Sequence, residues 1–100
     1  MEVIFNDKEH DRLETDPKYT ASRSPYIVKT YRKRMQIIRA APDERDFYKM
    51  KSLHYEKLHG NRSHQHSMKI NDQFRLIIEL VKESQGAATK VKIIGIEDYH

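Results

Sequence analysis

Three groups that exchange protons stand side by side near one end of the sequence, as Asp98, Tyr99 and His100. Alternate residues of an extended segment point to the same side, so Asp98 and His100 would share one side if a strand continued there. A carboxylate in that position can raise the pKa of an imidazole or orient its ring. We therefore expect His100 to act as a general acid or base, with Asp98 supporting it.

A second candidate is Arg75, which lies one residue into the otherwise apolar segment Phe74–Val81. An unpaired charge in such a segment is costly. A guanidinium stays charged at cellular pH and can bind two phosphate oxygens at once. Arg75 could therefore hold a phosphate, or it could form a structural salt bridge with a carboxylate such as Glu79. The residues alone leave both interpretations open.

Residue types of this kind suit RNA cleavage without a metal. That reaction needs a base for the ribose 2′-OH, cations for the phosphate and an acid for the departing 5′-oxygen. Tyr99 could stack on a base or donate a hydrogen bond near the cleaved bond. In the alternating segment 64–70, Lys69 falls on one face with Gln65 and Ser67, so it could line the same groove as Arg75.

Three motifs follow one another in the second half of the chain: Leu58-His59-Gly60-Asn61-Arg62, then Phe74-Arg75, and finally Asp98-Tyr99-His100. In this order they resemble the HigB branch of the RelE/ParE superfamily of bacterial toxins, which are small ribonucleases. The resemblance extends from about Leu58 to His100 and is loose before that. It implies a RelE-like fold and a catalytic site made of Arg75, His59 and the Asp-Tyr-His segment.

The resemblance also implies a toxin of a bacterial type II toxin–antitoxin system, which cuts mRNA in the ribosomal A site and so stops translation. Its partner would be a HigA-like helix-turn-helix antitoxin, and operator DNA would be contacted only through their complex. A sparse set of catalytic groups gains much when the ribosome holds the mRNA in position. Two alternatives stay open: a non-catalytic RNA- or ribosome-binding module, and an attenuated toxin acting mainly in the antitoxin complex and in operon regulation.

The Leu-x-Gly segment departs from its relatives at His59, where several of them carry a lysine. A lysine is charged at neutral pH, whereas an unperturbed histidine is mostly neutral. His59 could still act as a base or hydrogen-bond donor, or it could be a surface histidine in a turn. Lys57 could supply the missing charge. Arg62 could bind RNA or clamp the turn, and both roles stay open.

Charge is distributed unevenly along the chain. No acidic residue occurs between Asp16 and Asp43, whereas seven basic residues do: Lys18, Arg23, Lys29, Arg32, Lys33, Arg34 and Arg39. A stretch of one sign favours a polyanion or an acidic protein partner, although it could also be a solvated helix face. We expect Arg32 and Lys33 to contact RNA, together with Lys57, Arg62 and Lys69.

Composition limits the other possibilities. One hundred residues with 37% hydrophobic and 34% charged side chains indicate a single domain over residues 1–100. The lack of cysteine fits a reducing cytoplasm, and no apolar run approaches the ~18 residues that span a membrane. Six histidines include the pair His64 and His66, but no third ligand has diagnostic spacing. We therefore expect no metal, no cofactor and no membrane contact.

The elements that must position these side chains follow from periodicity. We predict a short strand over residues 3–5 and a short helix over residues 7–13. A longer helix is predicted over residues 26–41, which Ser24 and Pro25 would start and Pro42 would end. A shorter helix is predicted over residues 45–50, followed by strands over residues 64–70, 74–81 and 91–96, with a flexible connection at residues 84–88. Helices followed by successive strands predict an α+β fold, with a small antiparallel or mixed sheet and two or three N-terminal helices on one face.

Overall fold

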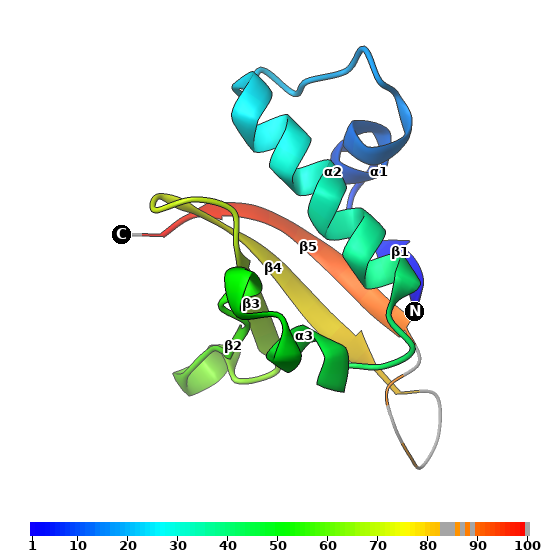
Figure 1. Cartoon of the computed structure of the whole chain (residues 1–100), viewed down its shortest axis with the longest axis vertical. Coiled ribbons are helices and arrows are strands. Elements are labelled where there is room, and N and C mark those ends of the chain that lie inside the picture. The colour runs from blue at the N-terminus through cyan, green and yellow to red at the C-terminus, as the bar shows by residue number, and fades with distance from the viewer. Residues whose placement is uncertain (83–85, 87, 89, 100) are drawn as a thin grey trace.

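Helices cover one face of a five-stranded sheet in the computed structural model, which describes residues 1–82, 86, 88 and 90–99 (Figure 1). The α+β class predicted from the sequence, with N-terminal helices on one face of a mixed sheet, is confirmed. In chain order the described elements are β1 (Glu2–Phe5), α1 (Lys8–Thr15), α2 (Pro25–Ala40), α3 (Arg45–Lys49), η1 (Lys51–Leu53), β2 (Glu56–Lys57), η2 (Gly60–Arg62), β3 (Gln65–Lys69), β4 (Phe74–Val81) and β5 (Lys90–Asp98).

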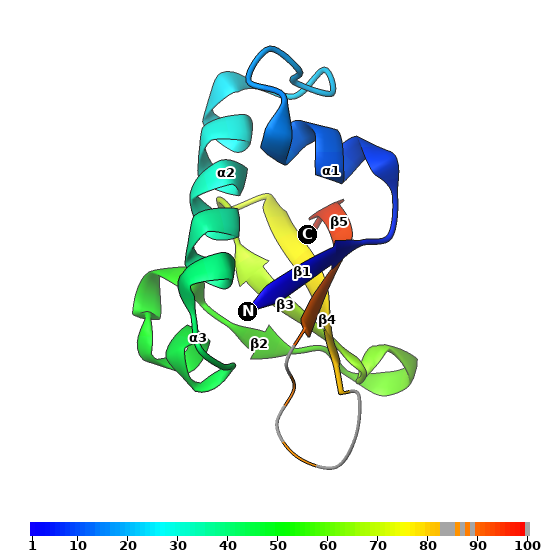
Figure 2. The same cartoon turned by 90° about the vertical axis from the view of Figure 1, so that its right-hand side faces the viewer.

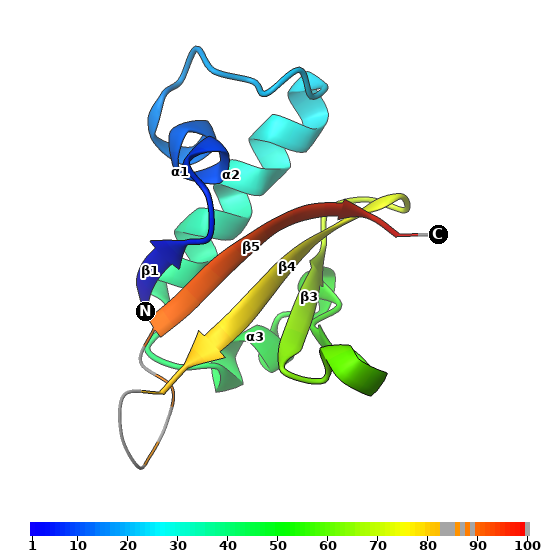
Figure 3. The ribbon, with the colours of Figure 1, turned by 180° about the vertical axis from the view of Figure 1, so that it is seen from behind.

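The strands lie in the order β1-β5-β4-β3-β2. β1 pairs with β5 in parallel, and the other three pairings are antiparallel. Figure 3 shows β3, β4 and β5 side by side, with α1 and α2 toward the top of the view. β4 therefore lies between β3 and β5, and its Arg75 is flanked by Lys69 on one side and Glu97 on the other.

The longest helix begins where the sequence predicted. The Ser24 hydroxyl accepts a hydrogen bond from the backbone N–H of Ile27 (3.3 Å), and Pro25 occupies the first helical position. α2 ends at Ala40, just before Pro42. Its inner face is buried, at Ile27, Tyr31, Met35 and Ile38, while Lys29 and Lys33 are exposed.

The shorter helices also form near their predicted positions. In α1 the side chain of Asp7 caps the helix by accepting from the backbone N–H of His10 (2.9 Å). α3 follows Asp43 and Glu44, as expected for a helix with acids at its start. No described helix has the length and apolar character needed to cross a lipid bilayer.

Three short elements between α3 and β3 were not predicted: η1, β2 and η2, of two or three residues each. Segments this short are smaller than one hydrophobic period, so periodicity cannot detect them. The strands differ less: β4 has the predicted limits, β3 is one residue shorter at each end and β5 is longer. The predicted connection at residues 84–88 lies largely outside the described residues.

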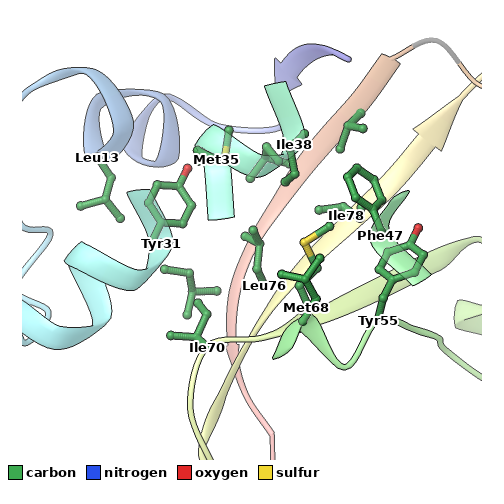
Figure 4. Close-up of a cluster of buried hydrophobic side chains, with 14 of the residues drawn as sticks. Leu13, Tyr31, Met35, Ile38, Phe47, Tyr55, Met68, Ile70, Leu76 and Ile78 are labelled. Atoms are coloured by element: carbon green, nitrogen blue, oxygen red, sulfur yellow. The ribbon is translucent and has the colours of Figure 1, made fainter. Parts of the chain in front are cut away.

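The core fills the space between the helices and the sheet (Figure 4). Tyr31, Met35 and Ile38 of α2 meet Leu76 and Ile78 of β4, and all five side chains are fully buried. Each such side chain stabilises the fold by about 1.5–3 kcal/mol relative to exposure. Further along the sheet, Phe47 of α3 and Tyr55 extend the same cluster, so α3 is packed against the sheet by its one buried aromatic residue.

The opposite face of the sheet carries a different set of side chains. Alternate residues of a strand point to opposite faces, so Arg75 and Ile77 of β4 point away from Leu76 and the helical core. Ile77 is paired with Ser67 of β3, and both are fully buried without belonging to the core cluster. This second face, which we call the open face, is where the polar side chains of β3, β4 and β5 gather.

A bulge in β5 accommodates a histidine from α1. The register with β4 shifts between Ile77 and Ile78, and Gly95 at this point has a φ of +149°. The ring of His10 lies so close that a Cβ on Gly95 would be 3.0 Å from its Cε1 atom. His10 Nε2 accepts a hydrogen bond from the backbone N–H of Ile96 (3.2 Å), and its Nδ1 is 2.9 Å from the Asp7 carboxylate. His10 thus ties α1 to β5, two elements whose ribbons are seen in Figure 2.

We predict that Gly95→Ala destabilises the protein more than Gly60→Ala. At Gly95 the new Cβ meets His10 and the backbone is strained, so we expect a loss of about 2–4 kcal/mol in the free energy of unfolding. At Gly60, where φ is +65° and nothing lies within 4 Å, only backbone strain of about 1–2 kcal/mol applies. Urea unfolding measures both, and equal losses would contradict the close contact with His10.

Candidate functional site

Arg75 lies on the open face with its guanidinium fixed by two neighbours. Its Nε donates to the hydroxyl of Ser67 (2.8 Å), and one terminal nitrogen donates to the backbone carbonyl of His54. Ser67 is fully buried and Arg75 is half-buried. Because both contacts hold one side of the planar group, its orientation is set before any ligand arrives.

His54 adopts an unusual backbone conformation at this contact. It follows η1 in the left-handed region, with a φ of +43°, and its side chain is exposed. Non-glycine residues are uncommon there, and histidine is among the few types enriched in it. The backbone carbonyl of this same residue accepts the hydrogen bond from the Arg75 guanidinium. The sequence analysis did not assign His54 to the site, because an exposed histidine in a short irregular segment gives no periodic signal.

Tyr99 lies next to Arg75. The guanidinium carbon is 5.5 Å from the centre of the phenol ring, within the range of a cation–π contact. The backbone N–H of Tyr99 donates to the carbonyl of Gln73 (2.6 Å), which holds this residue beside the turn before β4. The ring is nearly half exposed, at 45%. Arg75 and Tyr99 therefore present a cation and an aromatic surface together.

A neighbouring arginine, Arg62, binds the carboxylate of Glu97, which faces Arg75 across the strands. Glu97 is the β5 partner of Arg75, but its two oxygens accept hydrogen bonds from both terminal nitrogens of Arg62, at 3.0 and 2.7 Å. Arg62 also donates through Nε to the side chain of Gln65 (2.8 Å). The carboxylate raises the pKa of Arg62. Arg62 thus clamps η2 to the sheet, which is one of the two roles that the sequence left open.

As a result, Arg75 forms no ion pair with a carboxylate in the described part of the chain. Glu79, the partner suggested by the structural interpretation, instead accepts from the side-chain amide of Gln65 (3.0 Å). A half-buried, oriented guanidinium without a carboxylate is suited to an external anion. The local geometry therefore favours the ligand-binding interpretation of Arg75 over the salt-bridge interpretation.

The other terminal residues are placed differently. The β4–β5 register pairs Asp98 with Phe74, and paired residues share a face, so the Asp98 side chain leaves the sheet on the opposite side from Arg75. The Asp98 carboxylate accepts a hydrogen bond from the side-chain amide of Gln73 (3.1 Å). His100 lies outside the described residues. The structure thus brings Tyr99 to Arg75 and separates the Asp98 side chain from it.

Lys69 faces the same side of the sheet as Arg75, its partner across the strands. Its Nζ is 3.1 Å from a carboxylate oxygen of Asp72, which is fully exposed. A pair of this kind contributes at most about 1 kcal/mol. Lys69 therefore remains able to turn to a phosphate bound at Arg75, as the sequence analysis expected for the groove.

Lys57, which precedes the Leu-x-Gly segment, and His59 within the segment lie elsewhere. Lys57 pairs with His66 across β2 and β3, and His66 lies on the helix-covered side of the sheet with Met68. Lys57 is therefore not on the face of Arg75. His59 is exposed and precedes η2, and no side-chain contact of His59 is found among the described residues.

The two candidates on α2 also differ from each other. Arg32 donates to three backbone carbonyls, those of Leu13 (3.0 Å), Asp16 (2.9 Å) and Tyr19 (3.1 Å). These contacts hold the end of α1 and the following loop against α2, so Arg32 is engaged within the fold. Lys33, the next residue, is exposed and remains available to a partner.

A cavity of about 410 Å³ adjoins this site between the start of α2, η1 and the turn after β3. Its lining includes Tyr26, Arg34, His54 and Lys69. His54 and Lys69 are also neighbours of Arg75, so the cavity continues the same polar surface. Exposed aromatic rings beside cations are typical of surfaces that bind single-stranded nucleic acid. Within the part of the chain that the structure describes, no group of three or more acidic or histidine side chains could hold a metal ion.

Comparison with known proteins adds a family and a fold. The family of HigB-like toxins, described as RelE-like toxins of type II toxin–antitoxin systems, matches residues 3–91, which include Arg75 but not Tyr99. A search of curated proteins found no match. A YoeB/ParE toxin from Agrobacterium tumefaciens has a similar structure, with a TM-score of 0.58 and 13% identity over 100% of both chains. At that identity the likeness shows the fold alone.

We predict a measurable coupling between Arg62 and Glu97. Both side chains are more than a third exposed, so solvent screens the pair and we expect about 0.5–1 kcal/mol from a double-mutant cycle with Arg62→Ala and Glu97→Ala. The single-contact pair of Arg12 and Asp16 (3.4 Å) is the control, with a coupling near zero. Urea unfolding of the variants provides the values, and no excess over the control would mean that the clamp does not form in solution.

Proposed function

Because the chain belongs to the family of HigB-like toxins of type II toxin–antitoxin systems, we propose that it is a metal-independent endoribonuclease that cuts mRNA on the ribosome and thereby blocks translation. The observation that carries the proposal is the state of Arg75. Its guanidinium is oriented by Ser67 and His54, has no carboxylate among the described residues, and lies beside the ring of Tyr99.

Arg75 would bind the scissile phosphate. During cleavage negative charge builds on the phosphate oxygens, and fixed donors aimed at those oxygens lower the barrier because they need no rearrangement. Arg75 keeps donors free after its contacts with Ser67 and His54, since a guanidinium has five N–H groups. Lys69 on the same face would add a second positive charge.

Tyr99 would stack on a nucleotide base or donate a hydrogen bond near the cleaved bond. Proton transfer would fall to the remaining titratable groups of the sequence motif, namely His100, with support from Asp98, and His59. These assignments rest on the resemblance and on residue chemistry. The orientation of the Asp98 side chain away from Arg75 favours a supporting role for Asp98 over direct contact with the phosphate.

Ribosome dependence would compensate for the small number of groups at the site. The open face offers a cation, a second cation and one aromatic ring, without a deep substrate cleft around them. A ribosome that holds the mRNA in register would orient the substrate, which such a site cannot do alone. Correct orientation of the substrate contributes several kcal/mol to a rate enhancement. Exposed cations such as Lys33 on α2 would contact ribosomal RNA or the acidic surface of an antitoxin.

A type II toxin has an antitoxin partner. We propose that this partner is a HigA-like helix-turn-helix protein and that the pair, but not the toxin alone, contacts operator DNA. A cytoplasmic location follows from a ribosomal target. One observation favours the attenuated form of the same activity: His59 is exposed and has no side-chain hydrogen bond or ion pair among the described residues, at a position where the resemblance implies a lysine.

We predict that Arg75→Ala abolishes cleavage and growth arrest. Loss of one fixed donor to a charged transition state typically lowers the rate by about 10²–10³-fold. Arg75→Lys keeps the charge but not the planar fork, so its rate should fall between those of the native protein and Arg75→Ala. Lys8→Ala, an exposed change on α1, is the matched control and should cleave normally.

The measurement is the appearance of new mRNA 3′ ends with purified protein and translating ribosomes, with urea midpoints to confirm folding. Undiminished cleavage by folded Arg75→Ala would refute the assignment of Arg75. Ribosome binding by the native protein without any new ends would instead favour a non-catalytic RNA- or ribosome-binding module.

A second prediction separates the clamp from an RNA contact. Arg62→Ala should slow cleavage roughly three- to tenfold, because the released Glu97 carboxylate would then compete for Arg75. Arg62→Ala with Glu97→Gln should recover most of the rate, since no competing charge remains. The same cleavage measurement decides: if the double variant stays as slow as Arg62→Ala, Arg62 itself contacts the substrate.

A further inference from the structure

A second cavity lies on the helix-covered side of the sheet, away from Arg75. Its volume is about 540 Å³, and it is bounded by the start of α3, by Lys57 of β2, by His66 of β3 and by Leu80 and Lys82 at the end of β4. None of its lining residues lines the cavity beside Arg75. Its volume is in the range of small-molecule sites.

The rings of Tyr48 and His66 line this cavity, and the buried ring of Tyr55 supports both of them from behind. Tyr55 is stacked on His66, with ring centres 5.0 Å apart and planes 7° apart, and Tyr48 meets Tyr55 edge-on at 4.8 Å. Tyr48 is the outermost ring and is 57% exposed. The inner rings fix its position, so it offers a held aromatic surface on which a planar group can stack.

The acidic groups of the cavity already have partners. Asp43 binds the guanidinium of Arg45 (2.7 Å), and this pairing holds the pKa of Asp43 at about 2. Glu44 accepts from the hydroxyl of Tyr55 (2.8 Å) and lies 3.3 Å from Nε2 of His66. Asp43 is therefore paired with a cation, whereas Glu44 is engaged by neutral donors and keeps one negative charge, which two lysines of the cavity outweigh.

The lysines of the cavity, in contrast, have no carboxylate partner. Neither Lys57 nor Lys82 forms an ion pair within the described ranges of the chain. Both are exposed at the rim. The charge that remains available to a ligand is thus positive, and an anionic group is the occupant that complements it.

His66 adds an unsatisfied acceptor to the wall. Its contact with Glu44 uses Nε2, and burial lowers its pKa, so the ring is neutral and Nδ1 carries a lone pair. Nδ1 is buried and has no hydrogen-bond partner among the described residues. Buried polar atoms are usually satisfied, and an unsatisfied one costs about 1–3 kcal/mol. Because Nδ1 is buried, a ligand in the cavity does not reach it, and the site depends on the exposed ring of Tyr48 and on the lysines.

We propose that this cavity is a second binding site, which takes one nucleotide unit: a planar base against Tyr48 and a phosphate at Lys57 and Lys82. The nucleotide can be a free mononucleotide or an unpaired residue of an RNA strand, because both offer the same base and phosphate. This second site is distinct from the cleavage site at Arg75, because the sheet lies between them. A nucleotide can bind there whether or not the protein cleaves RNA at Arg75.

The test is a binding titration by calorimetry on the full chain carrying Arg75→Ala, so that RNA stays intact. The two ligands are AMP and a five-nucleotide unpaired RNA. In this background Lys57→Ala and Lys82→Ala should each weaken binding roughly three- to tenfold. Tyr48→Leu should weaken it about fivefold or more through lost stacking, whereas Tyr48→Phe should retain it. Lys8→Ala is the charge-matched control and should bind normally.

Binding of both ligands with this dependence supports the site for free nucleotides, and binding of the RNA alone supports it for an RNA strand. Absence of saturable binding, or equal affinity in Lys57→Ala, Tyr48→Leu and the control, overturns it. If neither ligand binds but Lys57→Ala weakens the antitoxin complex, the cavity is a protein interface and the proposal fails. Cleavage by the protein with native Arg75 is scored separately, so either proposal can fail without the other.

Discussion

The ion pair between Arg62 and Glu97 is the interaction on which the open face of the sheet depends. Two arginines and one carboxylate meet across β3, β4 and β5, and the carboxylate is bound by the arginine that comes from η2. This leaves Arg75 held only by neutral acceptors, the hydroxyl of Ser67 and the carbonyl of His54. Neutral acceptors fix the direction of a guanidinium without cancelling its charge, so the surface keeps a positive centre that is already oriented.

The two faces of the sheet use their histidines and aromatic residues differently. On the helix-covered side, His10 and His66 are buried and bonded to carboxylates, at Asp7 and Glu44, and they join separate elements of the fold. On the open face, His54 and Tyr99 leave their side chains exposed and contribute through a carbonyl and a ring face. Burial thus distinguishes groups that stabilise the fold from groups that remain available to a ligand.

Local signals in the sequence were sufficient for the longer helices and strands, but not for η1, β2 and η2 or for the strand order. Ser24 and Pro25 identified the start of α2, and the long apolar run identified β4, because capping and periodicity act between near neighbours. The site was only partly predictable, since its contacts join residues far apart in the chain. Arg62 and Glu97 are separated by 35 positions. The three carbonyls bound by Arg32 come from the end of α1 and from the loop after it, whose path has no periodicity. The register that turns Asp98 away from Arg75 is likewise a property of strand pairing, which alternation within one segment cannot give.

The sheet topology has a consequence for the order in which the molecule can assemble during synthesis. β5 lies between β4 and β1, so the first strand of the chain has no neighbour in the sheet until the last described strand has been made. Synthesis proceeds from the N-terminus at roughly 5–20 residues per second. An incomplete chain therefore carries Arg75 without Glu97, Tyr99 or the second flank of β4. The guanidinium centre is therefore complete only after β5 has been made, so an antitoxin that is already present can meet each new molecule as it folds.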